Sequence, residues 1–320
     1  MQLLAESAEI LGSQIIVNLA VSEDDLIQNS ARIKDFFESC FAECRRLEQA
    51  YSRFLPTSQL SRVNNNLGNW QQIDAEFLAM LRFAKSMHKA TNGYFDITIK
   101  SILDALGYDA NYSFAPKAKL GQLGNFELAL KNPDWGDELH LIEDFPEILS
   151  IDPQQFLGYQ CFVKTSAELD LGGFGKGYAL DLMVNLAHDF PNVLLDAGGD
   201  IYARGLGPDG EHWRIYLEDP NNPELALGLV QFEAASGGFL AASNPGKRNW
   251  GEAHHLVNPV LVTAEEQAKT NLASEIKGVF VQTAMSGALA DAWATALYVM
   301  GKSQAESYAS QATTYKAMIV

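Results

Sequence analysis

The sequence predicts an α+β protein with largely antiparallel sheets and packed helices. Short strand-like runs follow one another from about residue 147 onward, separated by glycine-rich turns. Only two helical patterns interrupt these runs, near 174–189 and 285–299, whereas a parallel sheet needs a crossover connection for each pair of strands. The first part of the chain instead predicts one apolar strand followed by helices.

Apolar spacing and capping side chains define the elements of the first hundred residues. The apolar run 13–21 predicts a strand. Ser22, with Asp25 three residues later, resembles a capping box, so we expect a long helix from there to about Arg46. Asp74 is the expected cap of a second helix, and Gly93 lies just beyond the end of that helix.

The rest of the chain predicts mainly strands and turns. The expected strands are 147–151, 159–163, 167–171, 192–196, 200–205, 212–218, 229–233, 238–243, 254–258, 277–284 and 316–320. Residues 106–146 are rich in Asn, Asp, Gly and Pro, which predicts loops, a short helix and hairpin strands. Because no repeat or linker interrupts the chain, we expect a single domain over 1–320, with 106–146 as an irregular insertion and two lobes as an open alternative.

Composition limits the range of partners. The chain has 320 residues, and its 23 Lys and Arg against 40 Asp and Glu give a net charge of −17. This charge argues against nucleic acid and anionic membrane surfaces, but a phosphorylated small molecule can bind where backbone N–H groups, a few basic side chains or a metal ion supply positive charge. The sequence has no secretory signal and no apolar run long enough to span a membrane, so we expect a cytoplasmic protein, or a periplasmic one if a leader was removed.

The segment 169–181 combines a predicted strand end, a glycine-dense turn and the start of a helix. Glycines let the backbone approach a ligand closely, and a helix N-terminus adds partial positive charge. Lys176 adds a full positive charge. This pattern is typical of phosphate binding, but it also fits a tight turn whose glycines serve packing alone, and both interpretations stay open.

The predicted helix over 288–297 places Asp291 and Thr295 among small and apolar neighbours. Residues four apart share a helix face, and a buried carboxylate needs a cation or several hydrogen-bond donors. A carboxylate and a hydroxyl are hard oxygen ligands that suit Mg²⁺. The alternative is structural: Asp291 would bond to neighbouring backbone, and Thr295 to a carbonyl one turn back.

Two further segments have weaker patterns. Tyr94 and Phe95 beside Asp96 could stack on a flat ring while the carboxylate accepts hydrogen bonds, although such a run is more often a helix end followed by an edge strand. The turn within 196–201 could bring backbone beside a ligand, or it could simply connect a hairpin.

Histidine chemistry is expected at one position. His254 and His255 are adjacent on a predicted strand and therefore point to opposite faces, so at most one of them can act as a general base in a given site. The other histidines, His88 among them, have no polar constellation around them in the sequence and are interpreted as surface or structural residues.

Taken together, the order and spacing of these segments resemble the ApbE family, the FAD:protein FMN transferases. The resemblance extends from about Gly12 to Gly301, and the segments 169–181 and 290–297 are its most specific parts. The segments that resemble the family are Ser52-Arg53-Phe54, 58–64 (SQLSRVN), 93–96 (GYFD), 169–181 (LDLGGFGKGYALD), 194–201 (LLDAGGDI), 254–259 (HHLVNP) and 290–297 (ADAWATAL).

The resemblance implies an ApbE-like, T-fold-related architecture and Mg²⁺-dependent chemistry. FMN would pass from FAD to a Thr hydroxyl of an acceptor protein, and AMP would leave. The acceptor would be a redox-pump or reductase subunit with an Asp-Gly-x-Thr-Gly-like motif. Carried over residue by residue, the Mg²⁺ ligands would be Asp291, Thr295 and the main chain of Gly173; the FAD site would be lined by Phe54, Tyr94, Phe95, Asp96, Asp170 and Lys176; and the catalytic base would be His255.

One segment departs from the family pattern. The family usually continues its histidine motif as Asp-Pro-x-Thr-Gly, whereas here Asn258-Pro259 is followed by 260–263 (VLVT). A carboxylate is lost and a turn is altered. Two other outcomes therefore stay open: an FAD pyrophosphatase that produces free FMN and AMP, and a flavin-binding protein without turnover.

Overall fold

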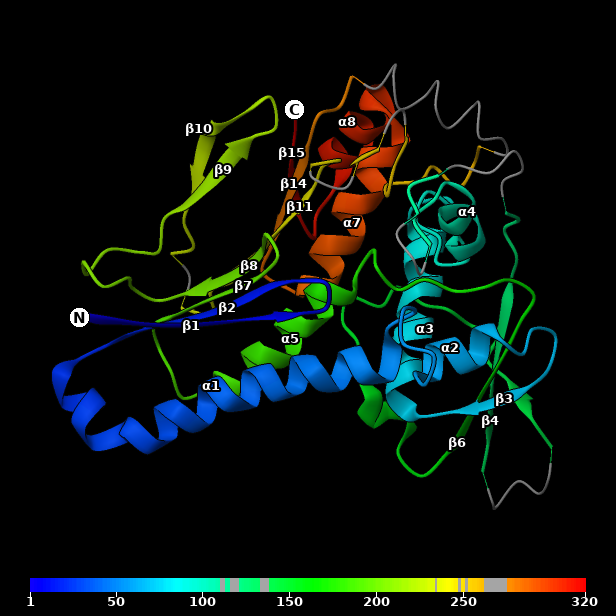
Figure 1. Cartoon of the computed structure of the whole chain (residues 1–320), viewed down its shortest axis with the longest axis horizontal. Coiled ribbons are helices and arrows are strands. Elements are labelled where there is room, and N and C mark those ends of the chain that lie inside the picture. The colour runs from blue at the N-terminus through cyan, green and yellow to red at the C-terminus, as the bar shows by residue number, and fades with distance from the viewer. Residues whose placement is uncertain are drawn as a thin grey trace.

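A seven-stranded sheet forms the largest layer of the computed structural model (Figure 1), which describes residues 1–109, 113–115, 121–132, 138–233, 235–246, 249–250, 253–261 and 275–320. Its strand order is β1–β2–β7–β8–β11–β14–β15, and every neighbouring pair is antiparallel. The bounds are Gln2–Ile10 (β1), Ser13–Val21 (β2), Val193–Ala197 (β7), Asp200–Arg204 (β8), Gly238–Ser243 (β11), Val279–Thr283 (β14) and Lys316–Ile319 (β15).

A smaller sheet and two hairpins lie outside this layer. The smaller sheet has the order β3–β6–β4–β5, again with antiparallel neighbours. Its strands are Gln71–Ile73 (β3), Phe126–Lys131 (β4), His140–Leu141 (β5) and Gln160–Thr165 (β6), and the hairpins are Ile215–Asp219 (β9) with Asn222–Val230 (β10) and Asn249–Trp250 (β12) with Ala253–His254 (β13). The predicted α+β fold with largely antiparallel sheets is confirmed.

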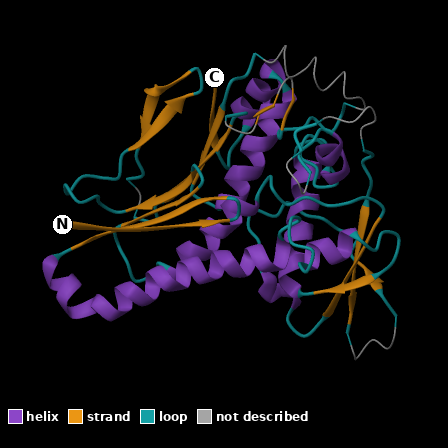
Figure 2. Ribbon diagram, in the orientation of Figure 1, coloured by secondary structure: helices purple, strands orange, loops and turns teal. Residues whose placement is uncertain are grey.

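Helices cover both sheets (Figure 2). In the described part of the chain they are α1 (Glu23–Tyr51), α2 (Gln59–Asn64), α3 (Ala75–Ala90), α4 (Lys100–Ala105), α5 (Gly175–Leu186), α7 (Gly287–Met300) and α8 (Lys302–Gln311), with a 3₁₀ helix at Pro153–Phe156. α5 and α7 pack on each other and on the large sheet, while α3 packs on β6 of the smaller one. Every residue of α7 except Thr295 is buried. No helix in the described ranges is long and apolar enough to cross a membrane.

The contact between α5 and α7 is unusually close, and glycine makes it possible. A Cβ atom on Gly177 would lie 2.1 Å from the carbonyl oxygen of Gly287. Asp181 of α5 also accepts three hydrogen bonds from the start of α7: from the Ser286 hydroxyl (2.7 Å) and from the backbone N–H groups of Gly287 (2.6 Å) and Ala288 (3.1 Å). These contacts fix the helix that bears Asp291 and Thr295 against the glycine-rich turn before α5.

The two predicted helix caps are confirmed. The Ser22 hydroxyl accepts a hydrogen bond from the Asp25 N–H at 3.0 Å, and Asp74 accepts one from Phe77 at 2.7 Å. α1 continues to Tyr51, five residues beyond the expected end. β1 and α8 were not predicted. β1 is exposed over most of its length, so its apolar pattern is weak, and its place is set by pairing with β2 across a tight turn.

Four strand predictions are wrong in whole or in part. Of 229–233, only Leu229 and Val230 belong to a strand. Residues 147–151 and 167–171 lie outside any strand. In 167–171, the backbone groups bond to a side chain and to a loop instead of to a neighbouring strand. Leu169 exchanges two hydrogen bonds with the amide of Asn64 (2.7 and 2.9 Å), and Asp170 donates to the Ile97 carbonyl at 2.7 Å. Of 254–258, only His254 belongs to a strand.

The expected hairpin within 106–146 is present as β4 and β5, which pair in antiparallel orientation. The described residues of 106–146 form no helix, and the nearest one, α4, ends just before them, at Lys100–Ala105. Residues 110–112, 116–120 and 133–137 fall outside the described ranges. The single domain over 1–320 stays a prediction.

Candidate active site

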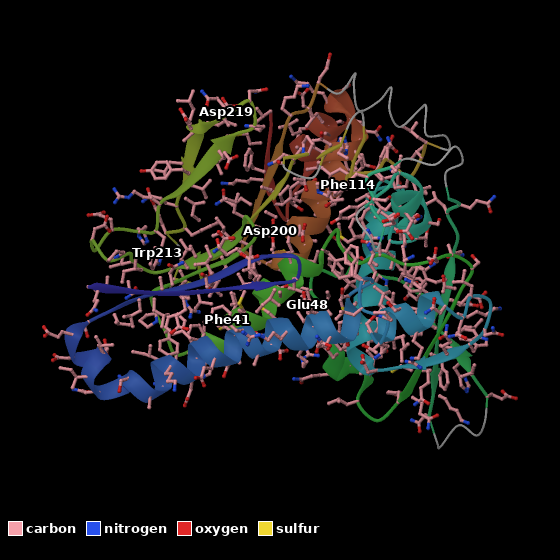
Figure 3. The ribbon with its side chains drawn as sticks, viewed as in Figure 1. Phe41, Glu48, Phe114, Asp200, Trp213 and Asp219 are labelled. Atoms are coloured by element: carbon pink, nitrogen blue, oxygen red, sulfur yellow. The ribbon has the colours of Figure 1, made fainter. Side chains whose placement is uncertain are left out.

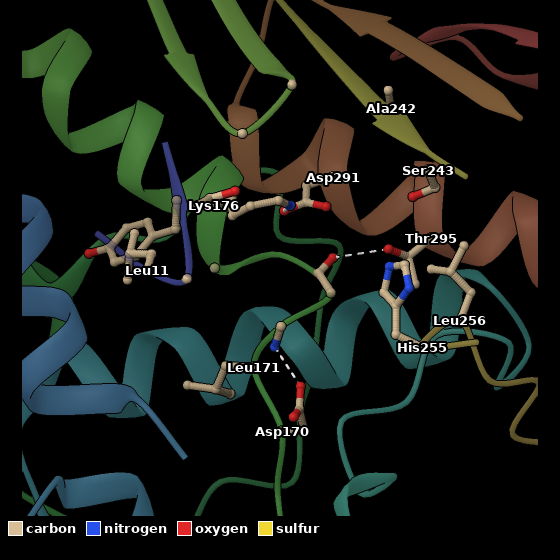
Figure 4. Close-up of a pocket in the computed structure, with 18 of the residues that line it drawn as sticks. Leu11, Asp170, Leu171, Lys176, Ala242, Ser243, His255, Leu256, Asp291 and Thr295 are labelled. Carbon is tan, nitrogen blue, oxygen red and sulfur yellow. Dashed lines mark hydrogen bonds and ion pairs between the residues drawn. The ribbon is translucent and has the colours of Figure 1, made fainter. Parts of the chain in front are cut away.

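All ten residues predicted for the site line one cavity of about 900 Å³ (Figure 4). They come from segments that are far apart in the sequence: Phe54, Tyr94, Phe95, Asp96, Asp170, Gly173, Lys176, His255, Asp291 and Thr295. The cavity lies where the glycine-rich turn meets α7, and the close-up places Lys176, Asp291, Thr295 and His255 around the same space. The sequence motifs therefore converge in three dimensions.

The glycine-rich turn is shaped by its neighbours. The Asp170 carboxylate accepts a hydrogen bond from the Gly172 N–H at 2.7 Å, and a Cβ on Gly172 would lie only 2.8 Å from that carboxylate. A Cβ on Gly173 would lie 3.1 Å from the Phe95 ring. The carbonyl oxygen of Gly173 instead faces α7 and accepts a hydrogen bond from the Thr295 hydroxyl at 3.4 Å. Glycine is therefore needed here for close packing.

Asp291 is 2% exposed and lies between two positive partners. Its Oδ2 atom is 3.2 Å from the Lys176 ammonium and accepts a hydrogen bond from the Gly177 N–H, also at 3.2 Å. Thr295 lies one turn further along α7. The carboxylate, the hydroxyl and the Gly173 carbonyl thus offer three oxygen atoms at one end of the cavity.

A second buried carboxylate, Asp200 at the start of β8 (labelled in Figure 3), also pairs with Lys176. Asp200 Oδ2 lies 2.6 Å from the ammonium. Burial raises the pKa of Asp200 to about 7, and the neighbouring Asp291 charge contributes to the rise. Burial alone would lower the pKa of Lys176, but Asp200 and Asp291 outweigh it and raise that pKa, so the side chain is a cation. The sequence had predicted a hairpin turn at 196–201, which the β7–β8 pairing confirms, but it gave no sign of this ion pair.

Arg53 is the second site residue that sequence reasoning missed. Its side chain is 5% exposed and lines the cavity, with Nε 2.6 Å from Asp170 Oδ2 and Nη1 2.8 Å from Asp104 Oδ1. The only signal in the sequence was its place between Ser52 and Phe54 in a segment that resembles the ApbE family.

Aromatic side chains line the cavity beside this arginine. The rings of Phe54 and Tyr108 meet edge to face at 6.0 Å. The Tyr94 hydroxyl donates a hydrogen bond to Gln304 at 2.9 Å. Phe95 is only 2% exposed and packs on Phe174, so it supports the cavity wall from behind.

The carboxylate of Asp96 is held by two neighbours. Oδ1 accepts hydrogen bonds from the backbone and hydroxyl of Thr98, at 2.7 and 2.8 Å. Oδ2 lies 3.3 Å from His88 Nδ1, and this hydrogen bond raises the pKa of His88. His88 is half exposed, so its interpretation as a surface residue holds, but the sequence did not show its polar partner, which lies eight residues away, beyond the end of α3.

The two adjacent histidines face different environments, as predicted. His254 is 7% exposed, its Nδ1 accepts a hydrogen bond from the Leu256 N–H at 3.2 Å, and burial lowers its pKa to about 4. It is therefore neutral near pH 7. His255 lines the cavity, with its ring 6.4 Å from the ring of Tyr108. Asn258 donates a hydrogen bond to the Val299 carbonyl at 2.9 Å, which ties this segment to the end of α7.

Residues 11–319 match the model of the ApbE family. The chain belongs to this family. Among ApbE relatives, it is similar to the FAD:protein FMN transferase of Haemophilus influenzae, with 24% identity over 79% of this chain and 69% of that protein. It is 26% identical to the Escherichia coli K12 protein of the same name, over 81% of this chain and 69% of the relative.

Solved ApbE structures share the fold. The ApbE protein of Thermotoga maritima superposes with a TM-score of 0.73 at 20% identity, covering 100% of this chain and 94% of that one. The apo form of the Pseudomonas stutzeri flavinyl transferase ApbE gives 0.70 at 18% identity, covering 100% and 95%. The predictions of an ApbE member, of an enzyme and of an ApbE-like fold are confirmed.

Proposed function

We propose that this chain transfers FMN from FAD to a Thr hydroxyl of an acceptor protein and releases AMP, in a reaction that depends on Mg²⁺. One observation supports this most directly: the glycine-rich turn, the Asp291–Thr295 pair and His255 line the same cavity. The names of the relatives, FAD:protein FMN transferases, agree with it.

The charge on the cavity wall favours a bound divalent cation. Among the residues that the structure describes, five carboxylates line the cavity: Glu48, Asp96, Asp170, Glu218 and Asp291. The cationic side chains of this described lining are Arg53 and Lys176, and each is already paired with two carboxylates. The dianionic pyrophosphate of FAD would add further negative charge, so a cation is needed for it to bind near Asp291.

The oxygen atoms at this end of the cavity fit Mg²⁺, which prefers hard oxygen ligands. The Asp291 carboxylate, the Thr295 hydroxyl and the Gly173 carbonyl would hold the ion. Bound there, the ion would neutralise phosphoryl charge and polarise the phosphorus that is attacked. Lys176 and the Gly177 N–H keep the Asp291 carboxylate in place through its Oδ2 atom.

The remaining steps fall to side chains and backbone of this chain. His255 would accept the proton of the acceptor Thr hydroxyl while the oxygen of that hydroxyl bonds to the FMN phosphorus. The bond between that phosphorus and the AMP oxygen would break in the same step. Gly175 and Lys176 at the start of α5 line the cavity, so the partial positive charge of this helix end would lie near the phosphate. Phe54 and Tyr94 would bound the ring systems of FAD, and Asp96, held by Thr98 and His88, would present a fixed acceptor at the wall.

Hydrolysis is the second candidate, and the segment after His255 favours it. Pro259 lines the cavity, but the Thr-Gly pair usual in the family is absent after it. A groove altered there would admit water in place of the acceptor hydroxyl. Val262 and Thr263 lie outside the described residues, so their part in such a groove stays a prediction.

A mass measurement separates these outcomes. The protein is incubated with FAD, Mg²⁺ and a peptide that contains an Asp-Gly-x-Thr-Gly sequence, and the peptide with Thr replaced by Ala serves as control. We expect an FMN adduct on the Thr peptide alone, together with AMP. Free FMN without adduct would indicate a pyrophosphatase, and bound FAD without either product would indicate a flavin-binding protein.

A pair of aspartate variants tests the cavity itself. Asp291→Asn removes the buried charge beside Lys176 and should abolish the adduct. Asp189→Asn, at an exposed aspartate paired with Arg32 outside the cavity, should leave adduct formation unchanged. Equal activity of the two variants would exclude the metal assignment.

A further inference from the structure

Arg53 is a buried arginine in a cavity lined with acids, and protein groups surround it on every side. Its Nε lies 2.6 Å from Asp170 Oδ2, and its Nη1 lies 2.8 Å from Asp104 Oδ1. Its Nη2 donates to the Tyr108 carbonyl at 2.6 Å. The rings of Phe54 and Tyr108 cover the guanidinium, with their centroids 4.5 and 4.9 Å from its central carbon.

These contacts favour a role in holding protein groups over a direct role in binding phosphate. Each nitrogen atom of the guanidinium has one protein acceptor, so three of its five N–H groups are directed at Asp170, Asp104 and the Tyr108 carbonyl. The side chain is 5% exposed, so little of it is open to a ligand. The arginine is therefore suited to act through the groups that it holds.

The group nearest to the proposed chemistry is Asp170, whose two oxygen atoms have different partners. Oδ2 faces Arg53, while Oδ1 accepts the Gly172 N–H at 2.7 Å. The next residue is Gly173, whose carbonyl faces the Thr295 hydroxyl. If the Asp170 carboxylate rotated, its hydrogen bond with the Gly172 N–H would break. The turn could then change shape, and the Gly173 carbonyl would no longer be held toward Thr295.

A chain of alternating charges holds Arg53 in turn. Asp104 Oδ2 lies 2.7 Å from Lys100, and Lys100 lies 2.7 Å from Glu168. The sequence of contacts Glu168–Lys100–Asp104–Arg53–Asp170 thus connects α4 to the glycine-rich turn. Only the last two of these side chains line the cavity.

We infer that Arg53 is a positioning residue: its fork joins Asp170, Asp104 and the Tyr108 carbonyl, and so fixes the glycine-rich turn in the shape that places the Gly173 carbonyl beside Thr295. This inference rests on the proposed function, because the Gly173 carbonyl matters only if it holds a cation there. It requires the geometry of a guanidinium and not merely a positive charge, since a lysine ammonium cannot reach three acceptors in one plane.

The test compares Arg53→Lys and Arg53→Gln with Arg32→Lys. Arg32 is a matched control, because it also pairs with an aspartate and lies over a phenylalanine ring, 5.5 Å from the centroid of Phe190, but it does not line the cavity. Calorimetric titrations with Mg²⁺ and with FAD are made without acceptor, and thermal unfolding shows that each variant is folded. A double variant, Arg53→Lys with Asp104→Asn, measures coupling.

We expect both Arg53 variants to remain folded and to bind Mg²⁺ about tenfold more weakly, a difference of about 1.4 kcal/mol, with Arg32→Lys unchanged. Asp104→Asn alone should weaken binding in the same direction by a smaller factor, and it should add nothing in the Arg53→Lys background. Arg53→Lys with wild-type affinity for Mg²⁺ would overturn the inference, as would additive effects in the double variant or wild-type protein that binds no Mg²⁺.

The titrations need no turnover, so they also separate this inference from the proposed function. A wild-type protein that binds Mg²⁺ and FAD but forms no adduct would contradict the transferase. The dependence on Arg53 would still be measured in that case, and a weaker affinity in Arg53→Lys would support it.

Discussion

Replacing Gly177 with alanine tests whether the contact between α5 and α7 sets the geometry of the cavity. The added Cβ would lie 2.1 Å from the carbonyl oxygen of Gly287 and 2.8 Å from the N–H of Ala288, whereas ordinary contacts begin at 3.4 Å. Both of these atoms belong to backbone, so no side-chain rotation can relieve the clash. The two helices must move apart.

The cost follows from this displacement. Overpacking of a core costs about 1–3 kcal/mol, and we expect the upper end, about 3 kcal/mol, because backbone meets backbone. For a chain of 320 residues this corresponds to a fall of about 4.5 °C in the thermal midpoint. The Gly177 N–H also donates to Asp291 at 3.2 Å, so the same displacement should raise the Mg²⁺ concentration for half-saturation about tenfold.

Gly175→Ala is the matched control, two residues earlier in the same helix. No atom lies within 4 Å of its added Cβ, and alanine favours the helix over glycine by about 0.5–1 kcal/mol. We expect its thermal midpoint to be unchanged or higher. If scanning calorimetry gave Gly177→Ala and Gly175→Ala equal midpoints, the reasoning from the close helix contact would be refuted.

Three further changes test other parts of the site. Asp181→Ala removes three accepted hydrogen bonds from the start of α7 and should lower the free energy of unfolding, measured in urea, by about 3 kcal/mol. Asp291→Ala should lower the rate of adduct formation at least about 100-fold. His254 has a folded-state pKa of about 4 against an ordinary 6.5, so its neutral form stabilises the fold above pH 6.5, and this contribution is lost as the pH falls toward 4. Between pH 7 and pH 5 the wild type should therefore lose about 2 kcal/mol more stability than His254→Gln.

Each of these has a clear contrary result. If Asp181→Ala unfolds at the same urea concentration as wild type, Ser286 alone is enough to cap α7. If Asp291→Ala keeps its activity, the proposed cation lies elsewhere. Parallel pH dependence of wild type and His254→Gln would mean that another buried group, and not this histidine, governs acid stability.

Local interactions made part of the fold predictable. The caps at Ser22 and Asp74 act on N–H groups three residues away, so short-range patterns are enough to find them. β1 is held by its pairing with β2 and has few buried side chains of its own, so its apolar pattern does not distinguish it from a loop. The extended segment at 167–171 has strand-like alternation, but its partner is the side chain of Asn64.

The sequence predicts which residues line the cavity where residue types and spacing are distinctive, as for Asp291 and Thr295. It does not predict which charged side chains of the site pair with each other. Lys176 meets Asp200 and Asp291 from three separate elements, and Arg53 meets Asp104 and Asp170 across 51 and 117 residues. The sequence showed Lys176 as a free positive charge beside a turn, whereas the fold pairs it with two carboxylates. Such pairings depend on the packing of α5 against α7 and β8, which no local pattern encodes.

The paired charges make the binding of FAD and of Mg²⁺ interdependent in the proposed reaction. In the described part of the lining, five carboxylates stand against two cationic side chains, both engaged with carboxylates, so a dianionic pyrophosphate should bind weakly when no divalent cation is present. Any gain in FAD affinity that Mg²⁺ causes must be matched by the same gain in Mg²⁺ affinity that FAD causes. Equilibrium titrations of each ligand with and without the other measure this factor, which we expect to be at least about 10, a coupling of about 1.4 kcal/mol. FAD that binds equally well in the presence of a chelator would show that Lys176 or backbone N–H groups neutralise the pyrophosphate on their own, and the electrostatic argument for the cation would fail.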